Sequence, residues 1–232
     1  MKRALHALLA MALVALPGAA SAAASLAPFK ATYAIRWGGM SAGTGTLRLD
    51  RIPGDDHWSY ESRIQGRGLF RLALPANQVS RSEFSIQNGR VVPLTFTSGE
   101  KNQDVRFDWG SGRVTGTVDG KRFDLPTQPG LLDTLSVQVA LMQELISGRT
   151  PARFVLVDED RIKDYIYAVE GSEMIESVAG TFRTDIYSSR RPGSRKATYF
   201  WCAPELGYLP LKVERREGRD VEWSMRLSEL QR

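Results

Sequence analysis

Cysteine and histidine are nearly absent from this chain of 232 residues. Cys202 is the single cysteine, and His6 and His57 are the two histidines. An internal disulfide needs two cysteines, and a zinc site needs three or four ligands drawn chiefly from these residue types, so we expect neither. A Ser-His or Cys-His hydrolase would have to use His57, which lies on the polar side of an alternating segment. We predict no catalytic, cofactor-binding or metal-binding residue, and we favour a non-enzymatic protein.

Long hydrophobic runs are also missing. The longest covers residues 4–16, directly after Lys2 and Arg3, and is shorter than the roughly 20 residues of a membrane-spanning helix. A Pro-Gly break and the small residues 20–22 follow it, as in a cleaved secretory signal. We therefore predict a signal peptide at residues 1–22 and a soluble periplasmic chain without a transmembrane segment. Cys202 lies far from the cleavage site, so we do not expect a lipoprotein.

Neither sign of charge dominates, because the chain has 31 Lys and Arg and 26 Asp and Glu, which gives a net charge of +5. The basic residues form no continuous stripe, which argues against nucleic acid as a partner. The sequence also lacks a phosphate-binding Gly-Lys-Ser loop, a Gly-x-Ser-x-Gly turn and a dinucleotide fingerprint. The densest basic segment, residues 190–196, is predicted to be a hairpin turn. Its arginines either face solvent or contact lipid phosphates and anionic envelope polymers.

What the sequence has in abundance is alternation of apolar and polar residues. It runs through residues 29–37, 57–64, 104–109 and 221–228, and its period of two is that of a half-buried strand. Turn signals such as Asn88-Gly89 and Asp119-Gly120 recur about every ten residues, as between consecutive antiparallel hairpins. No Pro-, Ser- or Gly-rich linker divides the chain. We predict one all-β, mainly antiparallel domain over residues 23–232.

Residues 131–147 break this pattern, because their apolar side chains recur at helical spacing. Asp133 can cap the first turn of such a helix, and Gly148 can end it in a left-handed conformation. A single helix cannot cover both faces of so large a sheet, so the sheet must bend around it. We predict a strongly curved barrel, closed or incompletely closed, with one central amphipathic helix against its inner face. A two-sheet sandwich is the alternative.

Aromatic residues point to a ligand, because all five tryptophans follow the predicted signal peptide. A bent sheet lined by aromatic residues and by the apolar side of a helix leaves room for an apolar molecule, unless the side chains interlock into a closed core. The residues predicted to line such a site are Trp37, Trp109, Leu135, Val139, Met142 and Trp223.

The predicted function is therefore a non-enzymatic periplasmic binding or envelope-maintenance protein. It would hold a lipid or another amphiphile between the curved sheet and the helix. One alternative is a hydrolase of envelope glycans, whose carboxylates would converge in space. The other is a module that binds an envelope protein.

Several motifs also carry a family resemblance. They are Trp37-Gly38-Gly39, Asn88-Gly89-Arg90, Phe107-Asp108-Trp109, Asp133-Thr134-Leu135-Ser136 and, most specifically, residues 201–210. On these motifs the chain resembles domain-of-unknown-function family 3108, a family of exported proteins of Gram-negative bacteria. The resemblance implies a periplasmic β-rich domain and transfers no catalytic residue. Residues 201–210 themselves predict a strand end, a stop at Pro204, a tight turn at Gly207 and a new strand from Leu209.

Overall fold

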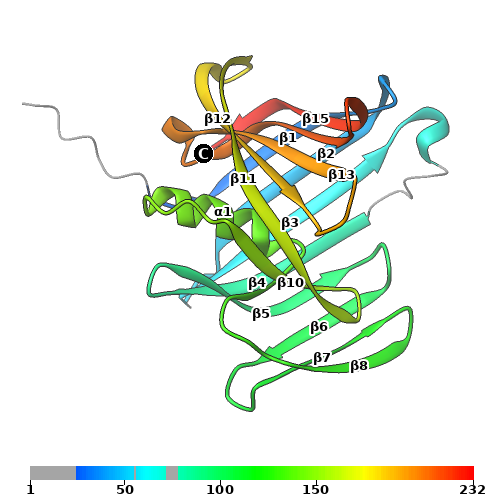
Figure 1. Ribbon diagram of the computed structural model, residues 1–232, viewed down its shortest axis with the longest axis vertical. Helices are drawn as coiled ribbons and strands as arrows, with labels where there is room; N and C mark the ends of the chain where they lie inside the picture. The colour runs from blue at the N-terminus through cyan, green and yellow to red at the C-terminus, as the bar shows by residue number, and fades with distance from the viewer. Residues whose placement is uncertain (1–24, 55, 72–77) are drawn as a thin grey trace, which may run out of the picture.

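The computed structural model describes residues 25–54, 56–71 and 78–232 (Figure 1). In this part of the chain 15 strands form a single sheet. The helices described are α1 (Ser136–Ile146) and two short 3-10 helices, η1 (Gly68–Arg71) and η2 (Pro204–Leu206). None of the described helices is long and apolar enough to cross a membrane. The signal peptide predicted for residues 1–22 lies outside the described residues.

Most strands are between six and twelve residues long, as is common in antiparallel sheets. In chain order they are β1 (Phe29–Trp37), β2 (Met40–Arg51), β3 (His57–Gly66), β4 (Gln78–Gln87), β5 (Arg90–Ser98), β6 (Gln103–Asp108), β7 (Arg113–Val118), β8 (Lys121–Pro126), β9 (Leu131–Asp133), β10 (Arg153–Asp158), β11 (Arg161–Ser177), β12 (Gly180–Arg190), β13 (Lys196–Ala203), β14 (Leu209–Glu217) and β15 (Asp220–Gln231).

The sheet consists of two meanders joined at the middle. Strands β1 to β8 follow one another on one side, and β15 back to β9 follow one another on the other, with β1 paired to β15. All neighbouring pairs are antiparallel except β9 and β10, which are parallel. The edge strands are β8 and β9, which do not pair with each other.

The curvature of this sheet confirms the predicted fold class. The sheet bends so far that β9, at one edge, contacts β5 in the other meander, yet no ladder of hydrogen bonds joins them. The described strands therefore make a strongly curved, incompletely closed barrel with α1 packed against β4, β5 and β9. Because these strands belong to one sheet, the alternative of a two-sheet sandwich is wrong.

Local sequence explains the strands and the turns between them. In β1 the alternate residues Phe29, Ala31 and Tyr33 are buried, while Lys30 between them is exposed. The β4–β5 turn places Asn88 and Gly89 at φ angles of 52° and 70°. Two successive positive φ angles match the right-handed twist of the flanking strands, and Asn and Gly tolerate them best. The alternation and the turn signals thus predicted this part of the fold correctly.

The helix is shorter than predicted. It begins at Ser136, and Leu131–Asp133, which the prediction placed in its first turn, form β9 instead. Leu131 fits the helical period with Leu135, but its backbone pairs in parallel with Val155 of β10 and its side chain is completely buried. A strand partner distant in the sequence therefore overrides the local period.

The two residues predicted to cap the helix do make capping contacts. The Oδ1 atom of Asp133 accepts hydrogen bonds from the backbone N–H groups of Leu135 and Ser136, at 2.8 and 2.7 Å. At the other end Gly148 has a φ angle of 71°, and the N–H of Arg149 donates to the carbonyl of Glu144. These contacts satisfy backbone groups that a helix end leaves without partners.

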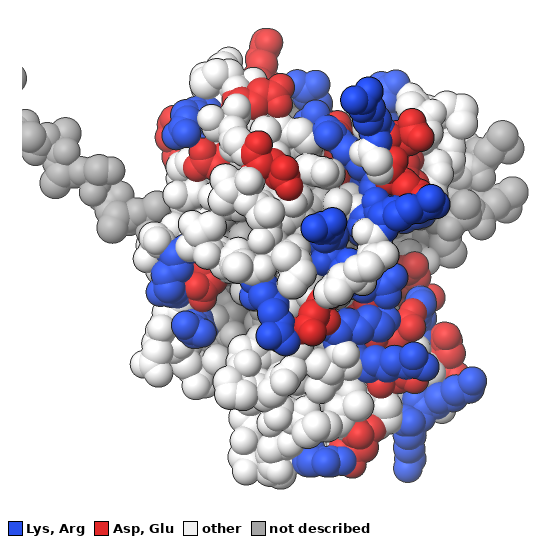
Figure 2. All heavy atoms as spheres, in the orientation of Figure 1, with Lys and Arg blue, Asp and Glu red and all other residues white. Residues whose placement is uncertain are grey.

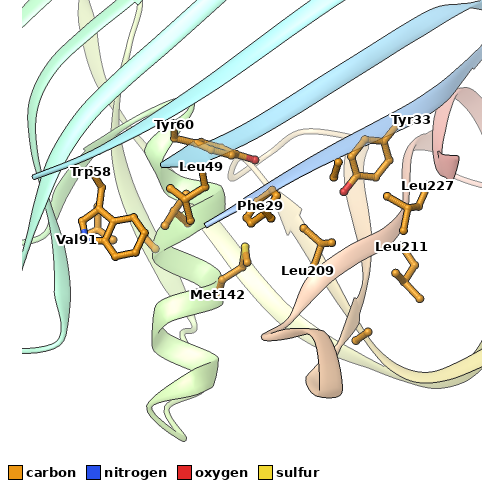
Figure 3. Close-up of a cluster of buried hydrophobic side chains, with 14 of the residues drawn as sticks. Phe29, Tyr33, Leu49, Trp58, Tyr60, Val91, Met142, Leu209, Leu211 and Leu227 are labelled. Atoms are coloured by element: carbon orange, nitrogen blue, oxygen red, sulfur yellow. The ribbon is translucent and has the colours of Figure 1, made fainter. Parts of the chain in front are cut away.

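The main core lies between α1 and the concave side of the sheet. Met142 of α1 points towards Phe29 and Leu49, and Trp58 lies beside Val91 in the same cluster (Figure 3). A second cluster lies towards β6 and β7, and consists of Phe96, Val105, Phe107, Val114, Leu131 and Val157. A third joins Leu141 and Leu145 of α1 to Tyr167, Tyr187 and Cys202. Side chains of α1 therefore contribute to both the main and the third cluster.

Candidate functional site

We use the term seam for the line along which β5 meets β9, under α1. Elsewhere in the described sheet, neighbouring strands are joined by backbone hydrogen bonds. At the seam β5 and β9 lie close together without pairing, and α1 packs against both strands. A ligand that enters at the seam breaks no strand ladder, so the seam is where the curved sheet can be approached at least cost.

A groove of about 320 Å³ opens at one end of the seam, beside α1, and is called the seam groove. Most of its lining is apolar and comes from β5, β9, β10, α1 and the loops that flank them. The lining residues are Arg90, Val91, Pro129, Gly130, Leu132, Ala140, Glu144, Pro151, Arg153, Phe154 and Val155. Its volume lies near the lower end of the roughly 300–1,000 Å³ usual for small-molecule sites.

Charged side chains of both signs surround the seam groove. Arg153 donates from Nε to Oδ1 of Asp164 at 2.8 Å, and Glu144 accepts from Nε of Arg149 at 2.5 Å. Arg90 is exposed and makes no ion pair with any other described residue. The groove thus combines an apolar floor with one uncommitted guanidinium group at its rim.

Arg149 also fixes the position of the helix next to the seam groove. Its Nη2 atom donates to the carbonyl oxygen of Gly89, in the β4–β5 turn, at 2.8 Å. Since Arg149 directly follows the left-handed Gly148, the end of α1 is tied to the turn that precedes Arg90. The width of the groove is therefore set by a polar contact as well as by packing.

The opposite end of the seam is polar. A hollow of about 270 Å³ there includes the carboxylates of Glu100, Asp158 and Glu159 in its lining. Lys101 forms an ion pair with Glu159, and Lys163 lies 3.0 Å from Oδ2 of Asp158. Two of the three carboxylates in this hollow are therefore paired with lysines. The predicted glycan hydrolase gains no support from this cluster.

Three of the six predicted ligand residues lie on the helix side of the core. Val139 and Met142 are buried in the main cluster, with exposed fractions of 0% and 2%. Leu135 packs against both the main and the second cluster. Trp58 and Tyr60 are buried in the same cluster.

The three predicted tryptophans lie in two different places. Trp109 stacks on Phe107 at 6.1 Å between ring centroids, and its Nε1 donates to the carbonyl of Pro93 at 2.7 Å. Trp37 and Trp223 are partners in the β1–β15 ladder, and Trp37 is 40% exposed.

The structure therefore corrects the prediction that the helix faces Trp37 and Trp223, whereas Trp109 packs against the second cluster, as Leu135 does. Trp37 lies eight residues along β1 from Phe29, which at about 3.3 Å per residue is roughly 26 Å from the packing with α1. Alternation placed the side chains on the correct face of each strand. It contains no information about which end of a strand meets the helix.

The residues that do line the seam groove were not predicted. Arg90 occurs in a motif that carried the family resemblance, but nothing in its local pattern marks it as part of a site. Val91, Ala140 and Phe154 are separated by many residues and meet because of the curvature of the sheet. The seam joins segments distant in the chain, so no local period could reveal it.

Comparisons with known proteins add a family but no activity. No curated protein matches the chain. Among solved structures, a Bacteroides fragilis protein with a YmcC-like fold is similar, with 9% sequence identity and a TM-score of 0.37 over 88% of this chain and 95% of that one. A family model described as a protein of unknown function, DUF3108, matches residues 32–218, which confirms the resemblance seen in the sequence. The chain belongs to the DUF3108 family.

Proposed function

We propose that the protein is a non-enzymatic, exported binding protein that holds an amphiphile with an anionic head group in the seam groove. One observation carries the proposal: an apolar groove of about 320 Å³ lies at the junction that no strand ladder closes. Aliphatic carbons would rest on Val91, Leu132 and Phe154, and Arg90 would contact the head group. Each methylene buried contributes about 0.8 kcal/mol, which supports micromolar binding of a single acyl chain.

Export to the periplasm is the second part of the proposal. It rests on the signal-like pattern of residues 1–22, and an amphiphile carrier would meet its ligand in the cell envelope. Amino-terminal sequencing of the protein from a periplasmic fraction should give Ala23 as the first residue. Protein that keeps Met1, or that remains in the cytoplasmic fraction, would refute this part.

Quenching of tryptophan fluorescence tests the groove directly. Trp58 lies beside Val91, so a fatty acid brominated along its chain should quench Trp58 when it is bound in the seam groove. The quenching should saturate at one ligand per protein. No tryptophan is part of the groove lining itself, but Trp58 packs beside Val91 of that lining, so the quenching should be strongly reduced in Trp58→Phe. Saturable binding with unchanged quenching in Trp58→Phe would place the ligand elsewhere.

Two further variants separate the groove from the interior behind the helix. Arg90→Gln should weaken binding of a fatty acid, whereas Arg122→Gln on β8 removes the same charge three strands away and should not. Val139→Phe fills space behind α1, where the six residues predicted from the sequence would place the ligand. If Val139→Phe abolishes binding in a protein that still folds, and Arg90→Gln has no effect, the ligand lies behind the helix and the groove proposal is wrong.

A further inference from the structure

The hairpin of β11 and β12 reaches beyond the rest of the sheet (Figure 1). The register of this hairpin shifts between Val169 and Gly171, where the strand bends. Beyond the bend, Glu173 accepts a hydrogen bond from Nε1 of Trp201 at 2.8 Å, and Ile175 is buried in the cluster that contains Trp201. Trp201 faces outwards, because the next residue, Cys202, packs with α1 on the inner side.

A cleft of about 510 Å³ lies on this outer face, between the base of the hairpin and the basic turn of residues 190–196; it is called the outer cleft. The basic turn connects β12 to β13, as the sequence predicted. The cleft is lined by Ile166, Ala168, Glu170, Ser188, Arg190, Ser194, Arg195, Ala197, Tyr199, Arg216 and Gly218. It lies on the opposite face of the sheet from α1 and shares no residue with the seam groove.

Three arginines lie around the outer cleft, and Arg216 makes the most contacts of them. Its guanidinium carbon lies 4.7 Å from the ring centroid of Tyr199, and its Nε donates to Oε2 of Glu214 at 2.7 Å. Burial opposes ionisation of Glu214, but hydrogen bonds from Lys212 and Arg216 outweigh it, so its pKa is lowered. Arg216 is thus held in place by a carboxylate that stays charged, with one of its nitrogens left free of that contact.

The other two arginines come from the basic turn. Arg195 forms an ion pair with Glu217 at 2.5 Å, but its side chain remains 86% exposed. Arg190 makes no ion pair with any described residue. Lys and Arg side chains gather on the right-hand side of the face in Figure 2, where the turn between β12 and β13 lies in Figure 1. The cleft is therefore open to an anionic group, which guanidinium groups bind through paired hydrogen bonds.

The remaining walls of the outer cleft offer other kinds of contact. Ser188 donates to Oε1 of Glu170 at 2.6 Å, and the second carboxylate oxygen of Glu170 can accept from a hydroxyl group. Ile166, Ala168 and Ala197 supply a small apolar surface. A carboxylate in the wall excludes a bare anion from part of the cleft, but it favours a ligand that carries hydroxyl groups next to its charge.

We propose that the outer cleft binds a sugar that carries a carboxylate or phosphate group. The anionic group would lie between Arg190 and Arg216, the hydroxyls would contact Glu170 and Ser188, and the apolar face of the ring would rest on Ala168. A cleft of about 510 Å³ accommodates such a ligand within the usual range of small-molecule sites. This proposal is independent of the seam groove and of the amphiphile.

Titration calorimetry of the purified protein with glucuronate and with glucose phosphate tests the proposal. Glucose provides the ring without the charge, and acetate and inorganic phosphate provide the charge without the ring. Both charged sugars should bind more tightly than any of these three. Arg190→Ala should weaken binding about tenfold or more, since a hydrogen bond to a charged group contributes that much.

Matched variants decide whether the cleft or the general positive charge is responsible. Arg191→Ala removes the same charge from the same turn, but Arg191 does not line the outer cleft, so its affinity should stay within about twofold of the parent. Ala168→Tyr fills the cleft from an exposed position and should abolish binding without a change of charge. Equal loss in Arg190→Ala and Arg191→Ala would overturn the proposal, as would full binding in Ala168→Tyr or equal affinity for inorganic phosphate and glucose phosphate.

Discussion

Replacing Asp133 with alanine should lower the free energy of unfolding by about 2–5 kcal/mol. The side chain is completely buried between β9 and α1, and its two oxygens accept four hydrogen bonds. Oδ1 accepts from the backbone of Leu135 and Ser136, and Oδ2 accepts from the hydroxyls of Ser82 and Ser136 at 2.7 and 2.8 Å. Loss of a helix cap costs about 0.5–2 kcal/mol, and each buried donor left without a partner about 1–3 kcal/mol.

Asparagine is the matched replacement, because its amide has the same shape. Its oxygen can accept from the two backbone N–H groups, and its NH₂ group can donate to the two serine hydroxyls after they rotate. We expect Asp133→Asn to cost about 1 kcal/mol or less at pH 7, well below the cost of Asp133→Ala. Urea unfolding monitored by circular dichroism measures both. Equal losses for the two variants, or a loss below about 0.5 kcal/mol for alanine, would show that the hydrogen bonds of Asp133 do not hold this junction.

The same pair of proteins tests the ionisation of Asp133. Burial raises its pKa, against the opposing effect of the hydrogen bonds from Ser136, Ser82 and Leu135. The folded state therefore holds the proton to a higher pH than the unfolded chain, where the pKa is about 3.9. Asp133 therefore makes its full contribution to stability at pH values below the pKa of the unfolded chain. The contribution is lost as the pH rises through the pKa that Asp133 has in the folded state. Wild type should lose stability relative to Asp133→Asn over this window, and a constant or opposite difference would refute the assignment.

Three other predictions follow from the packing. Val139→Asp buries a carboxylate in the main core, so it should cost several kcal/mol and abolish the cooperative thermal transition followed by circular dichroism. Gly43→Ala should lower the melting temperature, because a Cβ atom there would lie 2.1 Å from the carbonyl oxygen of Gln65. Gly38→Ala, which also has a positive φ angle but meets no atom within 4 Å, should be milder, and equal effects would contradict the role of the close approach. Cys202 is fully buried and burial raises its pKa, so a thiol reagent should label it only in denaturant; rapid labelling of the native protein would contradict this.

Local sequence was sufficient for the parts of the fold whose causes are local. Alternation in residues 29–37 predicts β1, because successive side chains of a strand point to opposite faces. Asp133 and Gly148 mark the ends of a helical segment, because the bonds from Asp133 to Leu135 and Ser136 and the left-handed conformation of Gly148 are local. In residues 201–210 the stop at Pro204, the left-handed Gly207 and the strand from Leu209 also occur as predicted. These features depend on contacts within a few residues.

Tertiary structure decided what depends on contacts between distant segments. Leu131 is a strand residue rather than a helical one because Val155 supplies its backbone partners. Trp37 and Trp223 lie at the exposed end of their ladder because the helix packs at the other end of β1. The seam groove exists because curvature brings β9 to β5, and the outer cleft because β11, β12, β13 and β14 bring residues of separate segments to one face. Alternation fixes the face of a strand on which a side chain lies, but the bending of the sheet determines which faces meet, and that depends on the whole chain.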